Sequence, residues 1–71
     1  MNPPLPKLPE EILQAALARE VEARDFYRDL AINCHVDFVR KLLERLQNEE
    51  AKHVSWVQEM LTRLHTGHDL V

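Results

Sequence analysis

The sequence has 71 residues, so it can form at most one small domain without a second core. Its residues are 45% hydrophobic and 30% charged, with one glycine and all four prolines at or before Pro9, which excludes a disordered or low-complexity chain. The net charge is −3, and the nine Lys and Arg residues are scattered among twelve acidic ones, so no basic stripe is available to bind nucleic acid.

Features of membrane and secreted proteins are also missing from the sequence. No apolar run approaches the roughly 20 residues of a membrane span, and the first residues show no signal-peptide pattern. The single cysteine, Cys34, cannot form an intrachain disulfide and suits a reducing compartment. We therefore predict a cytoplasmic helical protein with no membrane and no nucleic-acid partner.

The first predicted element is a helix over residues 9–33. Residues 1–8 contain three prolines and are predicted to be a flexible lead-in that is not helical. Pro9 followed by two acids is typical of a first helical turn, because proline needs no N–H partner there and the acids face the positive end of the helix dipole. Apolar residues then recur at three- and four-residue spacing, at Leu13, Ala16, Leu17, Val21, Ala23, Tyr27, Leu30 and Ala31.

The second predicted helix covers residues 37–65. The period is lost between Asn33 and Asp37, and Asp37 is a favourable N-cap residue, so we expect a short turn there. Gly67 is placed to end the helix, and residues 66–71 are predicted to be a tail. The apolar spacing resumes at Val39, Leu42, Leu43, Leu46, Val54, Val57, Met60, Leu61 and Leu64.

The predicted fold class is all-α, a single antiparallel two-helix hairpin over residues 1–71. A hairpin leaves much of each apolar stripe exposed to water. Ordering a chain of this length costs on the order of 100 kcal/mol, and small chains seldom offset that cost without a staple, a metal or a partner. We therefore predict a homodimer at minimum, in which two hairpins form a ferritin-like four-helix bundle.

Three polar residues interrupt the apolar faces. Glu50 has Leu46 and Val54 one turn away on the same face, and His53 follows it at i+3. Glu20 occupies the same kind of apolar position in the first predicted helix. An ionised carboxylate costs several kcal/mol to bury unless it is paired or binds a metal, so these residues indicate a functional site.

The two glutamates also lie at equal depth in the hairpin. Glu20 and Glu50 are each fifteen residues from residue 35 at the turn, about 22 Å along either helix, so they should face each other. A two-fold dimer then gathers four Glu and two His, which matches the di-iron arrangement of two Glu plus two Glu-x-x-His motifs. Carboxylates can bridge two cations, and one imidazole per metal leaves positions open for dioxygen. We predict that Glu20, Glu50 and His53 bind iron.

Other interpretations of these residues remain open. Glu20 could pair with Arg24 at i+4, and His53 could pair with Glu49 at i−4, both on solvated faces. Glu-x-x-His by itself is a weak motif, since about 0.4 chance matches are expected among eight Glu and four His. The equal depth of the two glutamates favours the metal site.

Further polar residues have two interpretations each. Tyr27, two turns from Glu20 on the same face, is either a core residue or a hydrogen-bond donor to a ligand carboxylate. Glu22 is either a surface charge or part of an entrance site for cations. His65 and His68 are expected to be exposed to solvent.

The motifs resemble a known family. Residues 20–27, Glu-Val-Glu-Ala-Arg-Asp-Phe-Tyr, and residues 50–53, Glu-Ala-Lys-His, resemble the encapsulated ferritins and related half-ferritins, two-helix relatives of the ferritin and rubrerythrin superfamily. The resemblance is ungapped over about residues 19–57. It implies a di-iron ferroxidase centre between two subunits, dimers that assemble into an annular decamer, and an encapsulin shell that receives the Fe(III) for storage. It also implies iron ligation by Glu20, Glu50 and His53, with Tyr27 supporting a ligand.

The sequence departs from this family at two places. The family often has an acidic pair at its entrance site, and here Arg19 stands at the first position while Glu22 keeps the acid, with Phe26 replacing the usual Trp. Encapsulated members carry a C-terminal shell-docking peptide, and this sequence ends at residues 68–71 without one. Two interpretations stay open: the sequence is a piece of a longer chain, or it is a half-ferritin that works without a shell.

The predicted function is therefore a ferroxidase that oxidises Fe(II) with dioxygen at an intersubunit di-iron site, for iron storage or detoxification. A different class of function is a non-catalytic helical-hairpin oligomerisation module, in which the interior acids are neutralised by Arg24 or by protonation. A third interpretation keeps the site without redox chemistry, because Zn(II) and Mn(II) also accept carboxylate and imidazole ligands.

Overall fold

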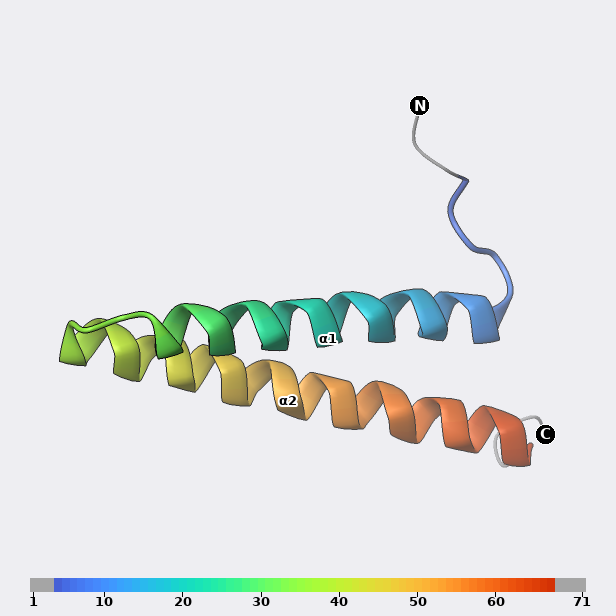
Figure 1. Cartoon of the computed structure of the whole chain (residues 1–71). Coiled ribbons are helices and arrows are strands. Elements are labelled where there is room, and N and C mark those ends of the chain that lie inside the picture. Colours follow the sequence, from blue (N-terminus) through green and yellow to red (C-terminus); the bar gives the residue numbers. More distant parts are fainter. Residues whose placement is uncertain (1–3, 68–71) are drawn as a thin grey trace.

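The structure is a computed structural model that describes residues 4–67. It contains two helices, α1 (Pro9–Ile32) and α2 (Asp37–Thr66), which lie side by side and run antiparallel (Figure 1). No strand occurs within residues 4–67, and the predicted all-α hairpin is confirmed. The molecule measures 50 × 34 × 12 Å, so it is one helix thick. Within the described part of the chain, neither helix is long and apolar enough to cross a membrane.

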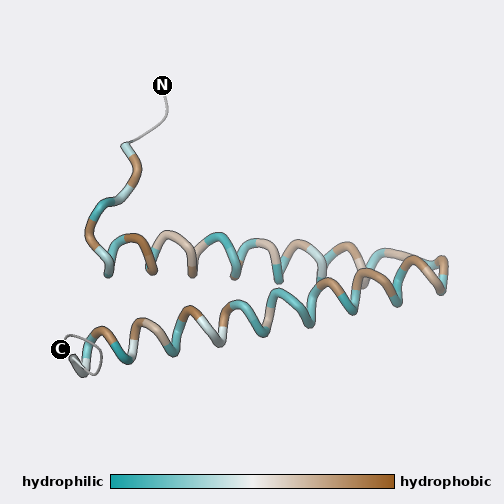
Figure 2. The backbone as a smooth tube through the Cα atoms, turned by 180° about the vertical axis from the view of Figure 1, so that it is seen from behind, coloured by the Kyte–Doolittle hydropathy of each residue, from teal (hydrophilic) through white to brown (hydrophobic). Residues whose placement is uncertain are grey.

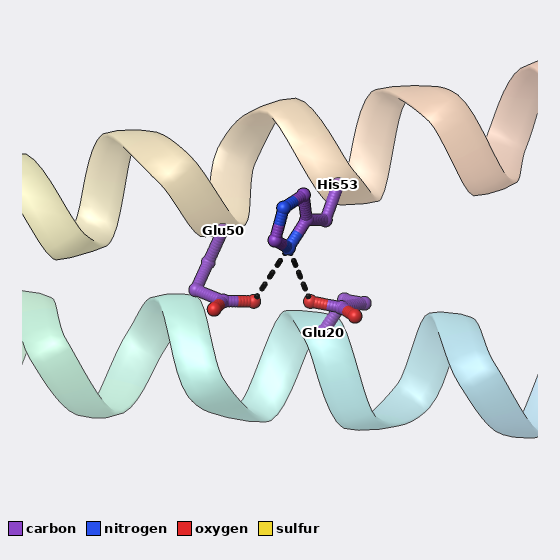
Figure 3. Close-up of side chains that lie close together, drawn as sticks. All are labelled: Glu20, Glu50 and His53. Atoms are coloured by element: carbon purple, nitrogen blue, oxygen red, sulfur yellow. Dashed lines mark hydrogen bonds and ion pairs between the residues drawn. The ribbon is translucent and has the colours of Figure 1, made fainter.

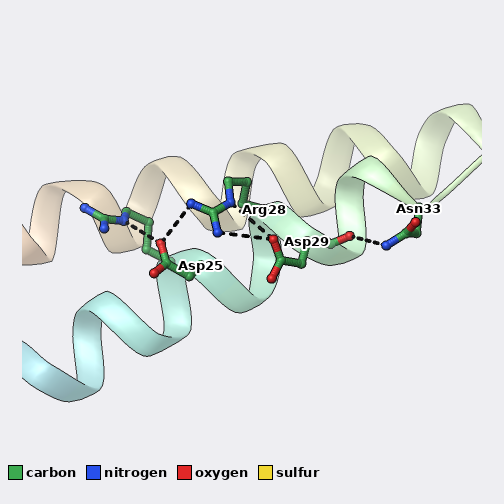
Figure 4. Close-up of polar contacts among 5 residues, drawn as sticks. Asp25, Arg28, Asp29 and Asn33 are labelled. Carbon is green, nitrogen blue, oxygen red and sulfur yellow. Dashed lines mark hydrogen bonds and ion pairs between the residues drawn. The ribbon is translucent and has the colours of Figure 1, made fainter.

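Helix α1 begins at the predicted residue and ends one residue early. Leu8 precedes it in extended conformation, and Pro9 is the first helical residue. Asn33 leaves the helical conformation with φ −94° and ψ 1°, so the helix ends at Ile32 rather than at the predicted residue 33. The Asp29 carbonyl oxygen accepts two hydrogen bonds from Asn33, one of 3.3 Å from the backbone N–H and one of 3.0 Å from the side-chain amide, and both hold Asn33 against the last turn (Figure 4).

Helix α2 begins without a side-chain cap. Val36 is the N-cap residue and Asp37 is the first helical residue, so the prediction that Asp37 caps the helix is wrong. The Asp37 carboxylate instead forms ion pairs with Arg40 and Lys41, one turn further on. Helical side chains lean toward the N-terminus of the helix, so the long side chains of Arg40 and Lys41 reach back to the Asp37 carboxylate.

The C-terminus of α2 depends on glycine. Gly67 has φ 70° and ψ 16°, a left-handed conformation that a residue with a Cβ adopts only at a cost. Its N–H donates to the Leu64 carbonyl oxygen at 3.3 Å, as predicted for a glycine that ends the helix. Thr66 still belongs to α2, one residue beyond the predicted end at residue 65. Residues 68–71 of the predicted tail, including His68, lie outside the described residues.

The hairpin buries little of its apolar surface. Within residues 4–67 only Ala31, Val54 and Leu61 are buried, and no polar or charged residue is. Apolar positions nevertheless recur along the whole length of both helices (Figure 2). The stripes are therefore wider than one partner helix can cover, and large apolar side chains remain exposed at Leu5, Leu8, Ile12, Phe26, Leu30, Ile32, Val36, Phe38, Leu42, Trp56 and Met60.

Candidate metal centre

Three side chains converge between the helices at about half their length. Glu20 comes from α1, while Glu50 and His53 come from α2 (Figure 3). The His53 Nδ1 atom lies 3.3 Å from a Glu20 carboxylate oxygen and 3.4 Å from a Glu50 carboxylate oxygen. One possible ligand atom from each residue lies within 4.8 Å of the others, so a single hairpin already gathers a three-residue cluster that could hold a metal ion.

The local geometry follows from helix periodicity. The i+3 spacing places Glu50 and His53 on one face of α2, and the equal depth of Glu20 brings its carboxylate to the same level from α1. The side chains of Glu20, Glu50 and His53 are 29%, 20% and 38% exposed, so the cluster is partly shielded from water but remains accessible. Because the cluster is accessible, ions can enter and leave it. Because it is partly shielded from water, the attraction between its carboxylates and a cation is stronger than at a fully exposed site.

The orientation of the imidazole defines which atom could bind a metal. His53 Nδ1 points between the two carboxylates, and the other ring nitrogen points away from them (Figure 3). Two carboxylates and one imidazole nitrogen form a mixed oxygen and nitrogen ligand set. Such a set suits Fe(II), Mn(II) or Zn(II) better than it suits Mg²⁺ or Ca²⁺, because Mg²⁺ and Ca²⁺ prefer ligand sets made only of oxygen.

The cluster has no Lys or Arg partner within the described chain. Arg24 contacts Asp25 at 3.2 Å and not Glu20, because Glu20 faces α2. Glu49 contacts Lys52 at 3.9 Å and not His53. The alternative in which these two neighbours neutralise Glu20 and His53 is therefore wrong.

The pKa values show that the cluster attracts positive charge. The hydrogen bond between Glu50 and Glu20 lowers the pKa of Glu20 and raises the pKa of Glu50, as expected for two carboxylates that share one proton. Desolvation opposes the charged form of His53, but hydrogen bonds to Glu20 and then to Glu50 outweigh it and raise the pKa of the imidazole. Protons thus occupy the position that a metal ion could take.

A second acidic region of α1 is neutralised by arginine. Asp25 accepts hydrogen bonds from Arg24 at 3.2 Å and from Arg28 at 3.3 Å, and Arg28 also contacts Asp29 at 3.2 Å (Figure 4). These acids have cationic partners on their own helix. They therefore form surface ion pairs and are not candidate metal ligands.

Two other predicted site residues lie outside the cluster. Tyr27 is half-buried, and its ring lies 5.6 Å from that of Phe26, but among the described residues its hydroxyl makes no hydrogen bond to the cluster. Glu22 is 68% exposed and forms an ion pair of 3.4 Å with Arg19. The role of Tyr27 in supporting a ligand and that of Glu22 at an entrance site stay predictions.

Sequence reasoning missed two contacts of the histidines. The Trp56 ring lies 5.4 Å from the His53 ring, and the i+3 spacing between the two residues was the signal for this contact. His65 Nε2 lies 2.9 Å from a Glu10 oxygen and so joins the open ends of α1 and α2. Glu10 is 25 residues and His65 is 30 residues from residue 35 at the turn. Counting residues from the turn therefore does not place them at the same level, and this contact could not be predicted in that way.

The fold and the cluster define a class of protein: an all-α hairpin with a carboxylate and histidine cluster between its helices. The family model of rubrerythrin matches residues 11–71, so the chain belongs to the rubrerythrin family, a ferritin-like di-iron family whose members bind iron. The resemblance to two-helix relatives of this superfamily is confirmed at that level. Neither the curated proteins nor the solved structures gave a significant match.

Proposed function

We propose that this protein is a ferroxidase that oxidises Fe(II) with dioxygen at a di-iron site formed between two hairpins. The observation that carries the proposal is the convergence of Glu20, Glu50 and His53, without a Lys or Arg partner in the described chain, in a member of an iron-binding family. A single cluster supplies three protein ligands, enough to hold one metal ion with positions left open.

A second copy of the hairpin would complete the site. Leu42, Trp56 and Met60 are exposed large apolar residues of α2, and their spacings of fourteen and four residues place them on one side of the helix. Trp56 contacts His53, so this apolar side borders the cluster. A partner covering it would remove the apolar side chains from water and bring a second cluster next to the first.

Each residue has a stated task in this proposal. Glu50 would bridge the two irons, Glu20 and His53 of each subunit would complete the coordination of one iron, and Tyr27 would orient a ligand carboxylate. Each Fe(II) loses one electron, and the two electrons pass to one dioxygen, which takes up two protons and leaves as hydrogen peroxide. The carboxylates remain ligands as the iron changes from Fe(II) to Fe(III).

The setting of the reaction is also part of the proposal. The resemblance of residues 20–27 and 50–53 to encapsulated ferritins supports assembly of dimers into a decamer. It equally supports delivery of Fe(III) to an encapsulin shell in the cytoplasm, for storage or detoxification. Glu22 is the acid that would attract incoming cations, although Arg19 reduces its effect by pairing with it.

Anaerobic titration with Fe(II) followed by exposure to air tests the proposal. The wild type should bind one iron per subunit and oxidise it rapidly, and Glu50→Ala should lose both properties while remaining helical. Glu10→Ala is the matched control, because it removes a glutamate that contacts a histidine outside the cluster. Normal oxidation by Glu50→Ala, or no saturable binding by the wild type, would contradict the assignment.

The exposed apolar side of α2 also supports a second candidate function, a non-catalytic oligomerisation module. Size-exclusion chromatography with Fe(II) and with a chelator separates the two functions. A module assembles equally well in chelator, whereas an intersubunit metal site links assembly to metal. Oxygen consumption then distinguishes a ferroxidase from a site that holds Zn(II) or Mn(II) without redox chemistry.

A further inference from the structure

An apolar arm projects from the open end of the hairpin. The arm, residues 4–8, precedes α1 and points away from both helices (Figure 1). Leu5 is 85% exposed and Leu8 is 64% exposed. Leu8 has φ −75° and ψ 140°, the polyproline II conformation, in which three residues make one turn. With Pro4 and Pro6 favouring the same conformation, Leu5 and Leu8 lie on one side of a stiff arm that its own chain leaves uncovered.

A second exposed apolar surface lies at the opposite end of the hairpin. The turn patch consists of Ile32, Val36 and Phe38, which are 70%, 51% and 78% exposed. It is separated from the arm by the length of α1, about 36 Å for 24 residues. A chain therefore cannot cover its own turn patch with its own arm.

The register of the proposed dimer places the two surfaces together when the hairpins point in opposite directions. Leu8 is twelve residues before Glu20, and Phe38 is twelve residues before Glu50, so each lies about 18 Å from the cluster. With the two clusters side by side, Leu8 of one copy reaches the level of Phe38 of the other. Leu5 is three residues further along the arm, about 9 Å, which is long enough to reach across the turn patch.

The charges favour the same orientation. Glu11 has no ion pair in the described part of the chain, and Lys41 shares the single carboxylate of Asp37 with Arg40. Glu11 is nine residues from Glu20 and Lys41 is nine residues from Glu50, so both lie about 14 Å from the cluster. Opposite hairpins place Glu11 at the level of Lys41 of the second copy, whereas hairpins pointing the same way would place like charges at one level.

We propose that the arm of each protomer docks on the turn patch of a second copy, so that the dimer is held at both ends as well as at the cluster. This inference rests on the proposed two-hairpin dimer. Two-fold symmetry makes the two contacts identical. The arm is already in an extended, proline-restricted conformation, so docking orders few additional residues.

A disulfide test uses the native Cys34, which lies in the turn and is only partly buried. Leu5→Cys is oxidised under mild conditions, and the linked peptides are identified by mass spectrometry. The inference predicts a Cys34 link to the introduced residue of the other chain, because a disulfide needs Cα atoms within about 7 Å and the two sites of one chain are at opposite ends. Gln58→Cys should give no link to Cys34, because in the proposed dimer its level is about 12 Å along the hairpin from Cys34 of the second copy.

The outcomes separate this inference from the proposed function. A dimer that binds iron but links only position 5 to position 5, or Cys34 to Cys34, overturns arm docking and leaves the ferroxidase intact. A wild type that stays monomeric with Fe(II) overturns both. As a second measurement, Leu5→Asp and Phe38→Asp should each weaken dimerisation by about tenfold in analytical ultracentrifugation, since each buries a charge at the same contact. An unchanged dissociation constant in both would also overturn the inference.

Discussion

Two contacts between a glutamate and a histidine join α1 to α2, and they differ in their surroundings. Glu10 and His65 meet at 2.9 Å at the open end, where both side chains are more than half exposed. Glu20 and His53 meet at 3.3 Å at mid-hairpin, where Glu50 adds a second carboxylate and the three side chains are less exposed. The shorter contact is thus an isolated surface pair, whereas the longer one belongs to a cluster with three possible ligands.

Ligand number and shielding, rather than a short contact, therefore distinguish the candidate metal centre from the surface pair. The pKa of His53 is raised by two carboxylates, and those same carboxylates compete for one proton. A divalent cation would replace that proton and the imidazole proton together. The open-end pair offers one carboxylate in water, where an ion pair is worth little.

The largest expected effect is a loss of metal binding when the histidine of the mid-hairpin cluster is removed. Removing the histidine of the open-end pair should have no such effect. His53→Ala should weaken anaerobic Fe(II) binding by more than about a hundredfold, beyond the effect expected for a residue that only supports a ligand. His65→Ala should leave the affinity unchanged. Calorimetric titration of both variants measures this, and equal losses would show that the mid-hairpin cluster is not special.

A second large effect is expected on dimerisation when a charge is introduced on the apolar side of α2 that borders the cluster. Trp56→Asp places a charge on the proposed dimer surface and should abolish dimerisation at micromolar concentration, together with iron oxidation. Gln58→Asp is the matched control, because two residues further on the side chain points to the other side of α2. Sedimentation of both variants tests this expectation, and a dimeric Trp56→Asp protein would place the interface elsewhere.

The pH dependence of stability should change sign when metal is added. In chelator, the raised pKa of His53 gives a stabilising contribution that is complete below its ordinary value of 6.5 and is lost as the pH rises through the raised value. Melting temperature in chelator should therefore fall as the pH rises above 6.5. With Zn(II) or Fe(II), Glu50 and His53 must lose protons, so stability should rise over the same range.

His53→Asn supplies the control for this comparison, because it removes the titrating group. Its melting temperature should show neither trend, whereas His65→Asn should keep both. A wild type whose stability rises with pH in chelator would contradict the raised pKa of His53.

Much of this architecture could be predicted from the sequence because helix periodicity is a local property. The start at Pro9 and the end at Gly67 follow from proline and glycine chemistry, and the convergence of Glu20 with Glu50 follows from counting residues to the turn. Periodicity could not tell which part of a wide apolar stripe faces the partner helix. Leu42 and Leu43 both fit the period, yet Leu42 is exposed and Leu43 is half-buried.

Other features depended on competition between partners, which sequence alone does not resolve. Asp37 could cap α2 or pair with the bases that follow it, and the ion pairs prevail. Glu20 could pair with Arg24 along α1 or with His53 across the hairpin, and the contact across the hairpin prevails because Glu20 faces α2. Long side chains reach several neighbours, so the choice is made by tertiary structure.

The smallest expected effect is the contribution of the open-end pair to stability. Glu10→Ala should lower the free energy of unfolding by less than about 1 kcal/mol, because an exposed ion pair is screened by water and salt. Urea unfolding at low and high salt measures it, and the difference from the wild type should decrease as salt increases. A loss several times larger would mean that the open end is stabilised by more than this contact.

In the proposed dimer, two hairpins hold two irons between their clusters. X-ray absorption at the iron edge of anaerobically loaded protein tests it most directly. We expect an iron–iron distance of roughly 3.5–4 Å with one imidazole per iron, and loss of the iron–iron signal in Glu50→Ala. A spectrum with isolated irons only, or the same iron–iron signal in Glu50→Ala, would contradict it.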